Sequence, residues 1–271
     1  MKHLFRNILG AVLAASVLTA CDEIKEDDRY IAVEGVTPVR SVLIEDFTGQ
    51  NCVNCPAAHG VIEKLVEQYG DKVIPVSIHA GGFGVSVESS RLPSYVGLMQ
   101  PEGNTMNDRY GINEWPKGVI NGHGGAKNTD EWAAAVRDEI AKDSPVAIEL
   151  EARYNAESNS VEIETSVIPH ADLNARLKIW VTESNIVAFQ RDINLGRIPD
   201  YVHNHVYRAS VTALDGDPVS LRSNYHTTLT HSIAVRDNDK EKWDVNSLSI
   251  VAFVADESGV LQAATTKVIT E

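Results

Sequence analysis

Residues 39–56 read V-R-S-V-L-I-E-D-F-T-G-Q-N-C-V-N-C-P, with an apolar run followed by two closely spaced cysteines. Its apolar first half, 39–47, predicts a β-strand. Residues 56–69 predict a helix because their apolar side chains recur on one helical face. Pro56 suits the first turn of that helix, where its missing N–H costs no hydrogen bond. The two cysteines of the stretch therefore stand between a strand and the start of a helix.

Cys52 and Cys55 form a CxxC pair whose first member lies at the helix start. Free N–H groups and the helix dipole stabilise a thiolate there, and the second thiol can then resolve a mixed disulfide. The pair could equally be a permanent disulfide, although so short a loop gains little stability from cross-linking. A structural zinc ion usually takes four ligands, and the chain has no second cysteine pair, so zinc is the least favoured interpretation.

The residues around this pair predict a small α/β unit over 38–143. Residues 80–106 are rich in Gly, Ser and Pro, and we expect an insertion there with a short helix near 94–99. The other elements expected in the unit are strands at 72–79 and 117–121 and a helix at 129–142.

The periodicity changes after Ser144. Short segments then alternate apolar and polar residues between Asn, Asp, Gly and Ser turns, which is typical of an all-β sandwich. We therefore expect a β-sandwich domain over 144–271, with a domain boundary near residue 144. The strands expected in it lie at 146–154, 160–168, 177–183, 201–211, 227–235, 248–255 and 260–268.

The unit over 38–143 resembles the thioredoxin superfamily. Asp46 lies six residues before Cys52, the spacing of the buried acid of thioredoxins, and Trp115-Pro116 resembles the segment that holds their cis-proline. The resemblance implies a cis Trp115–Pro116 bond. It also implies Cys52 as nucleophile, Cys55 as resolving thiol, Asp46 as proton carrier and Pro116 as one wall of a substrate groove.

The chain departs from thioredoxins beside the cysteines. Asn51 stands where tryptophan is usual, and Val53-Asn54 replace the Gly-Pro of thioredoxin. Because the residues between the cysteines help to set the reduction potential, the resemblance leaves both the potential and the redox partner open.

The first 20 residues predict a secretory signal, with basic Lys2 and Arg6, an apolar run too short to span a bilayer, and small residues before Cys21. The run Leu18–Cys21 resembles the lipobox of bacterial lipoproteins, which implies that Cys21 becomes the first residue and carries fatty acyl chains such as palmitate. Residues 21–37 predict a solvated acidic tether. It resembles the export signal of surface-displayed lipoproteins, so we expect an outer-membrane protein facing outward, with the periplasmic face as the alternative.

Composition limits the partners. The formal charge is −14, and it becomes −16 once Lys2 and Arg6 leave with the signal. Such acidity argues against nucleic-acid binding and keeps an exported protein soluble. The membrane is therefore the expected partner, through the lipid anchor, together with an unidentified protein, peptide or glycan.

Several side chains outside the CxxC pair are candidates for a site. His203 and His205 alternate on an expected strand, yet no carboxylate completes a ligand set, so we expect no metal and no cofactor. His79 and His123 are expected near strand ends on the CxxC side of the fold. Aromatic side chains that could stack on a sugar are expected to pack in the core instead; they are Trp180, Tyr201 and Trp243.

A second resemblance covers nearly the whole mature chain. Residues 45–56, the β-rich second half and residues 203–208 are similar to the twenty-eight-kilodalton outer-membrane lipoprotein family. That family pairs a thioredoxin-like domain with a C-terminal β domain, so the implied fold class is α/β plus all-β. Two functions follow, a binding or accessory lipoprotein and a thiol–disulfide oxidoreductase using Cys52 and Cys55. Surface display favours binding, because a redox partner is hard to supply outside the cell.

Overall fold

The computed structural model describes residues 38–270. The expected signal (1–20), the acylation site Cys21 and the acidic tether (21–37) lie outside the described residues. Among residues 38–270, no helix has the length and apolar character needed to cross a membrane. The described residues all belong to a single structural unit, Glu34–Glu271.

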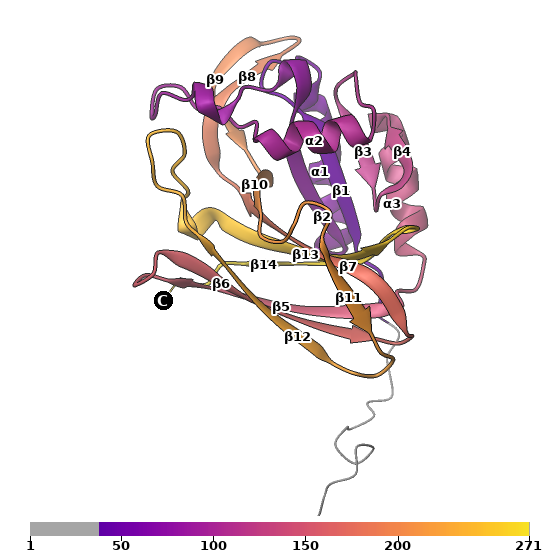
Figure 1. The fold of residues 1–271 in the computed structure, drawn as a ribbon. Helices are drawn as coiled ribbons and strands as arrows, with labels where there is room; N and C mark the ends of the chain where they lie inside the picture. Colours follow the sequence, from indigo (N-terminus) through magenta and orange to yellow (C-terminus); the bar gives the residue numbers. More distant parts are fainter. Residues whose placement is uncertain (1–37, 271) are drawn as a thin grey trace, which may run out of the picture. The chain divides into compact units, whose positions relative to one another are not determined.

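A nine-stranded sheet dominates residues 38–270 (Figure 1). The parallel strands β1 and β2 are connected through the helix α1, whereas β3 runs antiparallel to β1 and continues into β4. A parallel pair needs a crossover of this kind, and a helix usually supplies it. The bounds are β1 Val42–Thr48, α1 Cys55–Tyr69, β2 Val73–His79, β3 Lys117–Ile120 and β4 His123–Lys127.

Helices cover both faces of this part of the sheet, so every residue of β1 and β2 is buried. Val42 and Ile44 of β1 pack in one core cluster with residues of α1 and α3 (Trp132–Ile140). Leu43 and Phe47 point to the other face, where they join a cluster that includes Met106 of α2 (Pro101–Arg109). Five short 3-10 helices complete the helical segments of the described residues: Gly70–Lys72, Gly81–Phe83, Val87–Ser89, Thr129–Glu131 and Val245–Ser247.

The second half of the chain extends the same sheet. The strand order is β14-β13-β7-β10-β2-β1-β3-β4, with β11 also paired to β7. The joint between the halves is narrow, since Val206 pairs with Ser77 and the Ser77 N–H donates to the His205 carbonyl at 2.8 Å. These strands are β7 Leu173–Glu183, β10 Val206–Ser210, β11 Asp217–Leu221, β13 Leu248–Asp256 and β14 Gly259–Lys267.

Two smaller sheets complete the strands of the described residues. A three-stranded sheet of β5 (Val146–Asn155), β6 (Ser160–Pro169) and β12 (Thr227–Ala234) lies beneath β13 and β14 in Figure 1 and shares a core cluster with β7 and β13. A hairpin of β8 (Ile186–Asp192) and β9 (Gly196–His203) forms a sheet of its own at the top of the view.

Residues 38–270 form a mixed α/β structure in which strands predominate, which agrees with the predicted combination of helices and strands. The boundary expected near residue 144 falls between α3 and β5, and the nine-stranded sheet takes strands from both sides of it. Two local predictions are wrong. Residues 94–99 are not helical, and the helix of the insertion, α2, begins at Pro101 instead. The single strand expected at 201–211 is two strands, because His205 has a positive φ of 56° and turns the chain.

Candidate functional site

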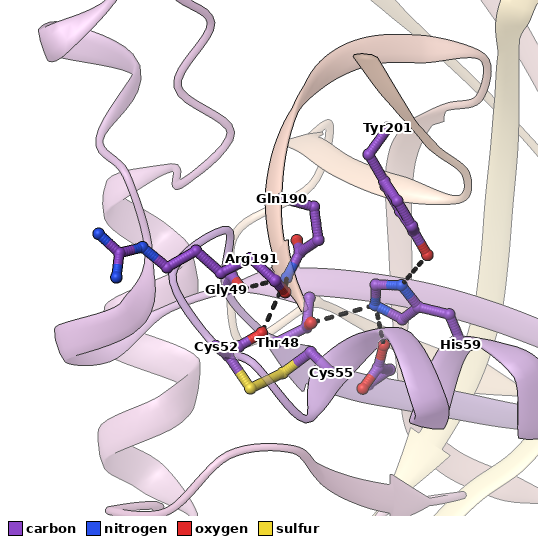
Figure 2. The surroundings of a disulfide bond; sticks show 9 residues. Thr48, Gly49, Cys52, Cys55, His59, Gln190, Arg191 and Tyr201 are labelled. Atoms are coloured by element: carbon purple, nitrogen blue, oxygen red, sulfur yellow. Dashed lines mark hydrogen bonds and ion pairs between the residues drawn. A yellow bond between two sulfur atoms is a disulfide. The ribbon is translucent and has the colours of Figure 1, made fainter. Parts of the chain in front are cut away.

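Cys52 and Cys55 form a disulfide at the start of α1 (Figure 2). The loop from β1 turns tightly into the helix, with the Cys52 N–H donating to the Gly49 carbonyl at 3.0 Å. Cys52 is 3% exposed and Cys55 0%. Neither sulfur is therefore presented to solvent, whereas a nucleophilic thiol needs access to its partner.

The loop before the disulfide lies under the insertion. The Asn51 N–H donates to the Phe83 carbonyl at 3.0 Å. At Gly49, a Cβ atom would come within 2.5 Å of the Phe83 carbonyl carbon, so only glycine permits this approach. The insertion therefore closes one side of the CxxC loop.

The β8–β9 hairpin closes another side. The Gln190 side chain is fully buried and donates to the carbonyl oxygens of Cys52 at 2.9 Å and Gly49 at 3.2 Å (Figure 2). The Arg191 N–H donates to the Gln50 carbonyl at 2.8 Å, and the Ile193 N–H to the Val53 carbonyl at 3.0 Å. A segment from the second half of the chain thus binds the backbone of the CxxC loop, which the sequence did not indicate.

Trp115–Pro116 is a cis peptide bond, as predicted. Because Lys117 pairs with Phe47, Pro116 lies at the end of β1 from which the CxxC loop emerges. The Trp115 ring packs edge-on against Phe83, with 5.5 Å between ring centroids. The predicted proline is therefore at the disulfide end of the sheet, together with the part of the insertion that covers the loop.

Asp46 is completely buried on β1 beneath α1 and faces His59 of the helix. Burial raises the pKa of Asp46 to about 8, an effect that a hydrogen bond from Ser77 partly offsets. Burial also lowers the pKa of His59 to about 4. The carboxyl oxygen and the His59 Nε2 lie 3.5 Å apart, a distance typical of an ion pair, yet these pKa values make both groups uncharged at pH 7.

His59 connects Asp46 to the hairpin. Its Nε2 lies 3.1 Å from the Thr48 hydroxyl, and its Nδ1 lies 2.8 Å from the Tyr201 hydroxyl (Figure 2). His59 is not among the residues predicted for the site, although its position four residues after Cys55 on a predicted helix places it one turn beyond the disulfide.

A cavity of about 310 Å³ opens beside this group. It is lined by residues of α1, β2 and β9 and of the turn after β9. The polar ones include His59, His79, Tyr201, His203 and His205, and the apolar ones are Ile62, Val66 and Val202. His79 ends β2 and pairs with Thr48, the last residue of β1, so its expected place on the CxxC side of the fold is confirmed.

Two histidine expectations are wrong. His205 lies in the turn between β9 and β10, so it does not share a strand with His203. His123 pairs with Ile120, whose partner on β1 is Ile44, and it therefore lies far along β1 from the CxxC loop because β3 is antiparallel. In the described part of the chain, no group of three or more His, Cys, Asp or Glu side chains is arranged to ligate a metal ion.

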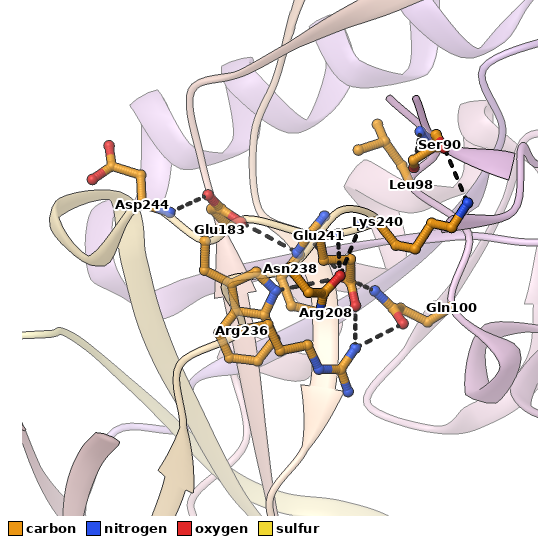
Figure 3. Close-up of polar contacts among 12 residues, drawn as sticks. Ser90, Leu98, Gln100, Glu183, Arg208, Arg236, Asn238, Lys240, Glu241 and Asp244 are labelled. Atoms are coloured by element: carbon orange, nitrogen blue, oxygen red, sulfur yellow. Dashed lines mark hydrogen bonds and ion pairs between the residues drawn. The ribbon is translucent and has the colours of Figure 1, made fainter. Parts of the chain in front are cut away.

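Figure 3 shows a second buried polar group, centred on Arg208 of β10. Its Nε lies 3.2 Å from a Glu183 oxygen and its Nη2 2.9 Å from a Glu241 oxygen. Glu241 also accepts hydrogen bonds from Gln100 and Arg236. These residues come from β7, β10, the residue before α2 and the loop before β13, so the network holds distant segments together.

The aromatic candidates are mostly core residues. Trp180 is 1% exposed and Trp243 4%, as expected for packing in the core. A wider groove of about 1310 Å³ lies beside Trp243, and its lining includes Val187 and Ile269, two large apolar side chains exposed to solvent.

Comparisons with known proteins support one family. Residues 103–271 match the family described as outer membrane protein Omp28. The structure is similar to HBP35 of Porphyromonas gingivalis, with a TM-score of 0.62, 15% identity, and coverage of 84% of this chain and 75% of that chain. It is also similar to protein AGR_C_4864 of Agrobacterium tumefaciens, with a TM-score of 0.51, 15% identity, and coverage of 84% and 94%. A domain of the outer membrane lipoprotein Omp28 of Porphyromonas gingivalis aligns over 47% of this chain and 91% of that domain, with 17% identity and a TM-score of 0.35. No curated protein matches the chain.

Proposed function

Because the chain belongs to the Omp28 family of outer membrane proteins, we propose that it is a lipoprotein anchored through Cys21 and displayed outward, with ligand binding as its main role. The ligand is a protein, peptide or glycan. The lipobox-like run Leu18–Cys21 and the acidic tether that follows support the anchor and the outward display.

The observation that carries the binding role is the covered disulfide. A catalytic CxxC pair must present its first sulfur to a partner disulfide or thiol. Here both cysteines are buried, and Gln190, Arg191 and Ile193 of the hairpin are bonded to the backbone around them. In this proposal the disulfide fixes the β1–α1 junction, and the groove beside Val187 and Ile269 offers apolar contact surface to a ligand.

We also propose the finer fold assignment, a thioredoxin-like arrangement over 38–143 and a β-sandwich over 144–271. The β1–α1–β2 crossover, the CxxC pair at the start of α1 and the cis bond before Pro116 support the first part. The core cluster shared by the three-stranded sheet with β7 and β13 supports the second.

A trapping experiment tests the role of the cysteines. Cys55→Ala, expressed in its native envelope, leaves Cys52 as a free thiol without a resolving partner. If the disulfide is structural, non-reducing gels of Cys55→Ala and of the control Cys52→Ala show the same pattern, with no mixed disulfides. Mixed disulfides that form in Cys55→Ala and are absent in Cys52→Ala would contradict a purely structural disulfide and would support thiol–disulfide exchange as the main function.

Location and lipidation are tested separately. Mass spectrometry of the membrane-extracted protein should find an acylated N-terminal peptide beginning at Cys21, and Cys21→Ala should leave the membrane fraction. Protease treatment of intact cells should remove the protein. Survival of the protein in intact cells, with digestion only after lysis, would assign it to the periplasmic face.

Thiol–disulfide exchange is the second candidate, and Asp46 is the observation that favours it. Its buried carboxyl has the spacing from Cys52 that the thioredoxin resemblance implies, and a pKa of about 8 lets it hold and release a proton near neutral pH. In this candidate Cys52 attacks, Cys55 resolves, Asp46 carries the proton and Pro116 shapes the groove. The hairpin would then have to move before Cys52 could react.

A further inference from the structure

β12 (Thr227–Ala234) is the edge strand of the three-stranded sheet, with β6 on one side of it and no strand on the other. None of the main-chain hydrogen bonds within residues 38–270 joins its outer edge to another segment. In Figure 1 the strand lies at the bottom of the fold, beside β5 and β6. The N–H and C=O groups that point to the outer side of β12 can therefore pair with an added strand.

The other edge strands of residues 38–270 are protected, and β12 is not. Proline, charged side chains, short length or a covering segment usually prevent pairing at an edge. β9 contains Pro199, β11 contains Pro218, and β4 has two glycines and ends at Lys127. β5 and β14 lie beside each other, and β8 is bonded to the CxxC loop. β12 has eight residues, T-T-L-T-H-S-I-A, without proline, glycine, carboxylate, lysine or arginine.

β12 also leaves apolar surface half covered. Its side chains alternate, and Thr228, Thr230 and Ser232 are exposed on the outer face of the sheet. Leu229 and Ile233 point to the opposite face, where they pack against the core cluster shared with β7 and β13 and stay only partly buried. A strand added at this edge would cover them from the side, so apolar burial would add to the main-chain hydrogen bonds.

From these observations we propose that two copies of the chain pair through β12, antiparallel and about a twofold axis, so that two three-stranded sheets form one sheet of six strands. Directly opposite residues of antiparallel strands share a face, so the axis passes beside one residue, which then faces its own copy. An axis at His231 would oppose two imidazole rings. An axis at Thr230 instead opposes two threonines and places Thr228 opposite Ser232, and such hydroxyl pairs stabilise a sheet.

Charge favours a second copy as the partner. The formal charge of the chain is −14, so most surfaces of two copies repel each other, but β12 contributes none of the acidic residues. On the outer face, Glu162 and Glu164 lie one strand away on β6. In the pair they are three strand spacings, about 14 Å, from their counterparts, beyond the screening length of about 8 Å at physiological salt. On the inner face, Asp217 of β11 lies 3.9 Å from Nε2 of His231 in its own chain.

The pairing is independent of the proposed ligand binding and of any chemistry at Cys52 and Cys55, and cross-linking in the native envelope tests it. Thr230→Cys should give a covalent dimer with a short thiol-to-thiol reagent, because opposite Cβ atoms of paired strands lie about 4.5–5.5 Å apart. Glu164→Cys is the control on the same face, and its counterpart at about 14 Å is beyond such a reagent. Absence of the dimer in Thr230→Cys, or equal dimer in both variants, would overturn the proposal.

A second measurement needs no cross-linker. Sedimentation of the mature protein in density-matched detergent should give twice the mass of one chain. Thr230→Lys should give the mass of one chain, because it opposes two ammonium groups at the axis and a lysine protects an edge strand. Ser220→Lys places the same charge at an exposed position of β11 and should leave the dimer intact.

Circular dichroism checks that both lysine variants fold. A single-chain mass for the unaltered protein, or a dimer that survives Thr230→Lys, would show that β12 is not the surface through which two copies meet.

Discussion

The side-chain amide of Gln190 donates a hydrogen bond to the carbonyl oxygen of Cys52 at 2.9 Å, although 138 positions separate the two residues in sequence. The same nitrogen lies 3.2 Å from the Gly49 carbonyl. The backbone of the CxxC loop therefore has part of its hydrogen bonding satisfied by the β8–β9 hairpin. The state of the disulfide and the position of the hairpin are physically linked.

We expect Gln190→Ala to destabilise the protein by about 2 kcal/mol, because it leaves buried carbonyl oxygens without their donor. It should also speed the reduction of the Cys52–Cys55 disulfide by dithiothreitol, since the hairpin no longer holds the loop. Urea unfolding and a timed thiol assay measure the two effects. Gln68→Ala, at an exposed position of α1, is the control and should change neither. An unaltered reduction rate in Gln190→Ala would show that the hairpin does not guard the disulfide.

Replacing both cysteines by alanine should cost about 2 kcal/mol of unfolding free energy, the effect expected when a cross-link closes only a very short loop. Urea unfolding of the double variant, compared with the unaltered protein in the presence and absence of reductant, measures it. The reduced unaltered protein serves as the control and should resemble the double variant. A loss several times larger would mean that the cysteines contribute to the core beyond the cross-link.

Stability should fall as the pH rises from 7 to 8, and Asp46 is the cause. In the folded protein its carboxyl keeps a proton up to a pKa of about 8, whereas its ordinary value is 3.8. The folded state therefore binds more protons than the unfolded state over that range, and raising the pH favours unfolding. The unfolding free energy should fall by roughly 1 kcal/mol between pH 7 and pH 8. Urea unfolding at both pH values measures it.

The protonation of two other buried groups also affects stability, but neither accounts for the loss between pH 7 and 8. Glu45, whose pKa burial raises to about 7, acts in the same direction but mainly below the window. His59, with its pKa lowered to about 4, acts in the opposite direction, and only below its ordinary value of 6.5. Asp46→Asn should flatten the dependence between pH 7 and 8. A slope that persists in Asp46→Asn would contradict the assignment.

Arg208→Met should destabilise the protein by about 3–5 kcal/mol, because it leaves the buried carboxylate of Glu183 without a counter-charge and leaves that of Glu241 with Arg236 alone. Thermal or urea unfolding measures the loss. Arg153→Met removes an exposed partner of Glu151 and should cost about 0–1 kcal/mol. Equal effects of the two substitutions would show that burial does not govern the strength of the Arg208 network.

The sequence predicted the elements whose signals are local. The strand before the CxxC pair, the helix after it and the cis bond at Pro116 follow from residues close together in the chain, and the structure contains all three. The alternating pattern of the second half likewise located most of its strands, since a strand with one buried face must alternate.

The features that the sequence missed are long-range or depend on a single backbone angle. Gln190 gives no sign in the sequence that it will meet the Cys52 loop, because that contact depends on how two distant segments fold together. The strand expected at 201–211 fails at His205, where one positive φ angle, which apolar patterning cannot reveal, ends β9. The contact between Tyr201 and His59 is missed for the same reason. It is formed by the folding of two distant segments and is not indicated by the spacing of the two residues in the sequence.

The narrow joint between Ser77 and Val206 sets an order of events during synthesis and secretion. β2 is synthesised early. Its edge opposite β1 stays unpaired until β10 has been synthesised, more than 120 residues later. Until then the buried residues of β2 stand at an open sheet edge that other chains can pair with. The central sheet therefore cannot close until most of the chain has been made. Chaperones that bind unfolded chains should accordingly hold this protein for longest between the emergence of residue 79 and that of residue 206.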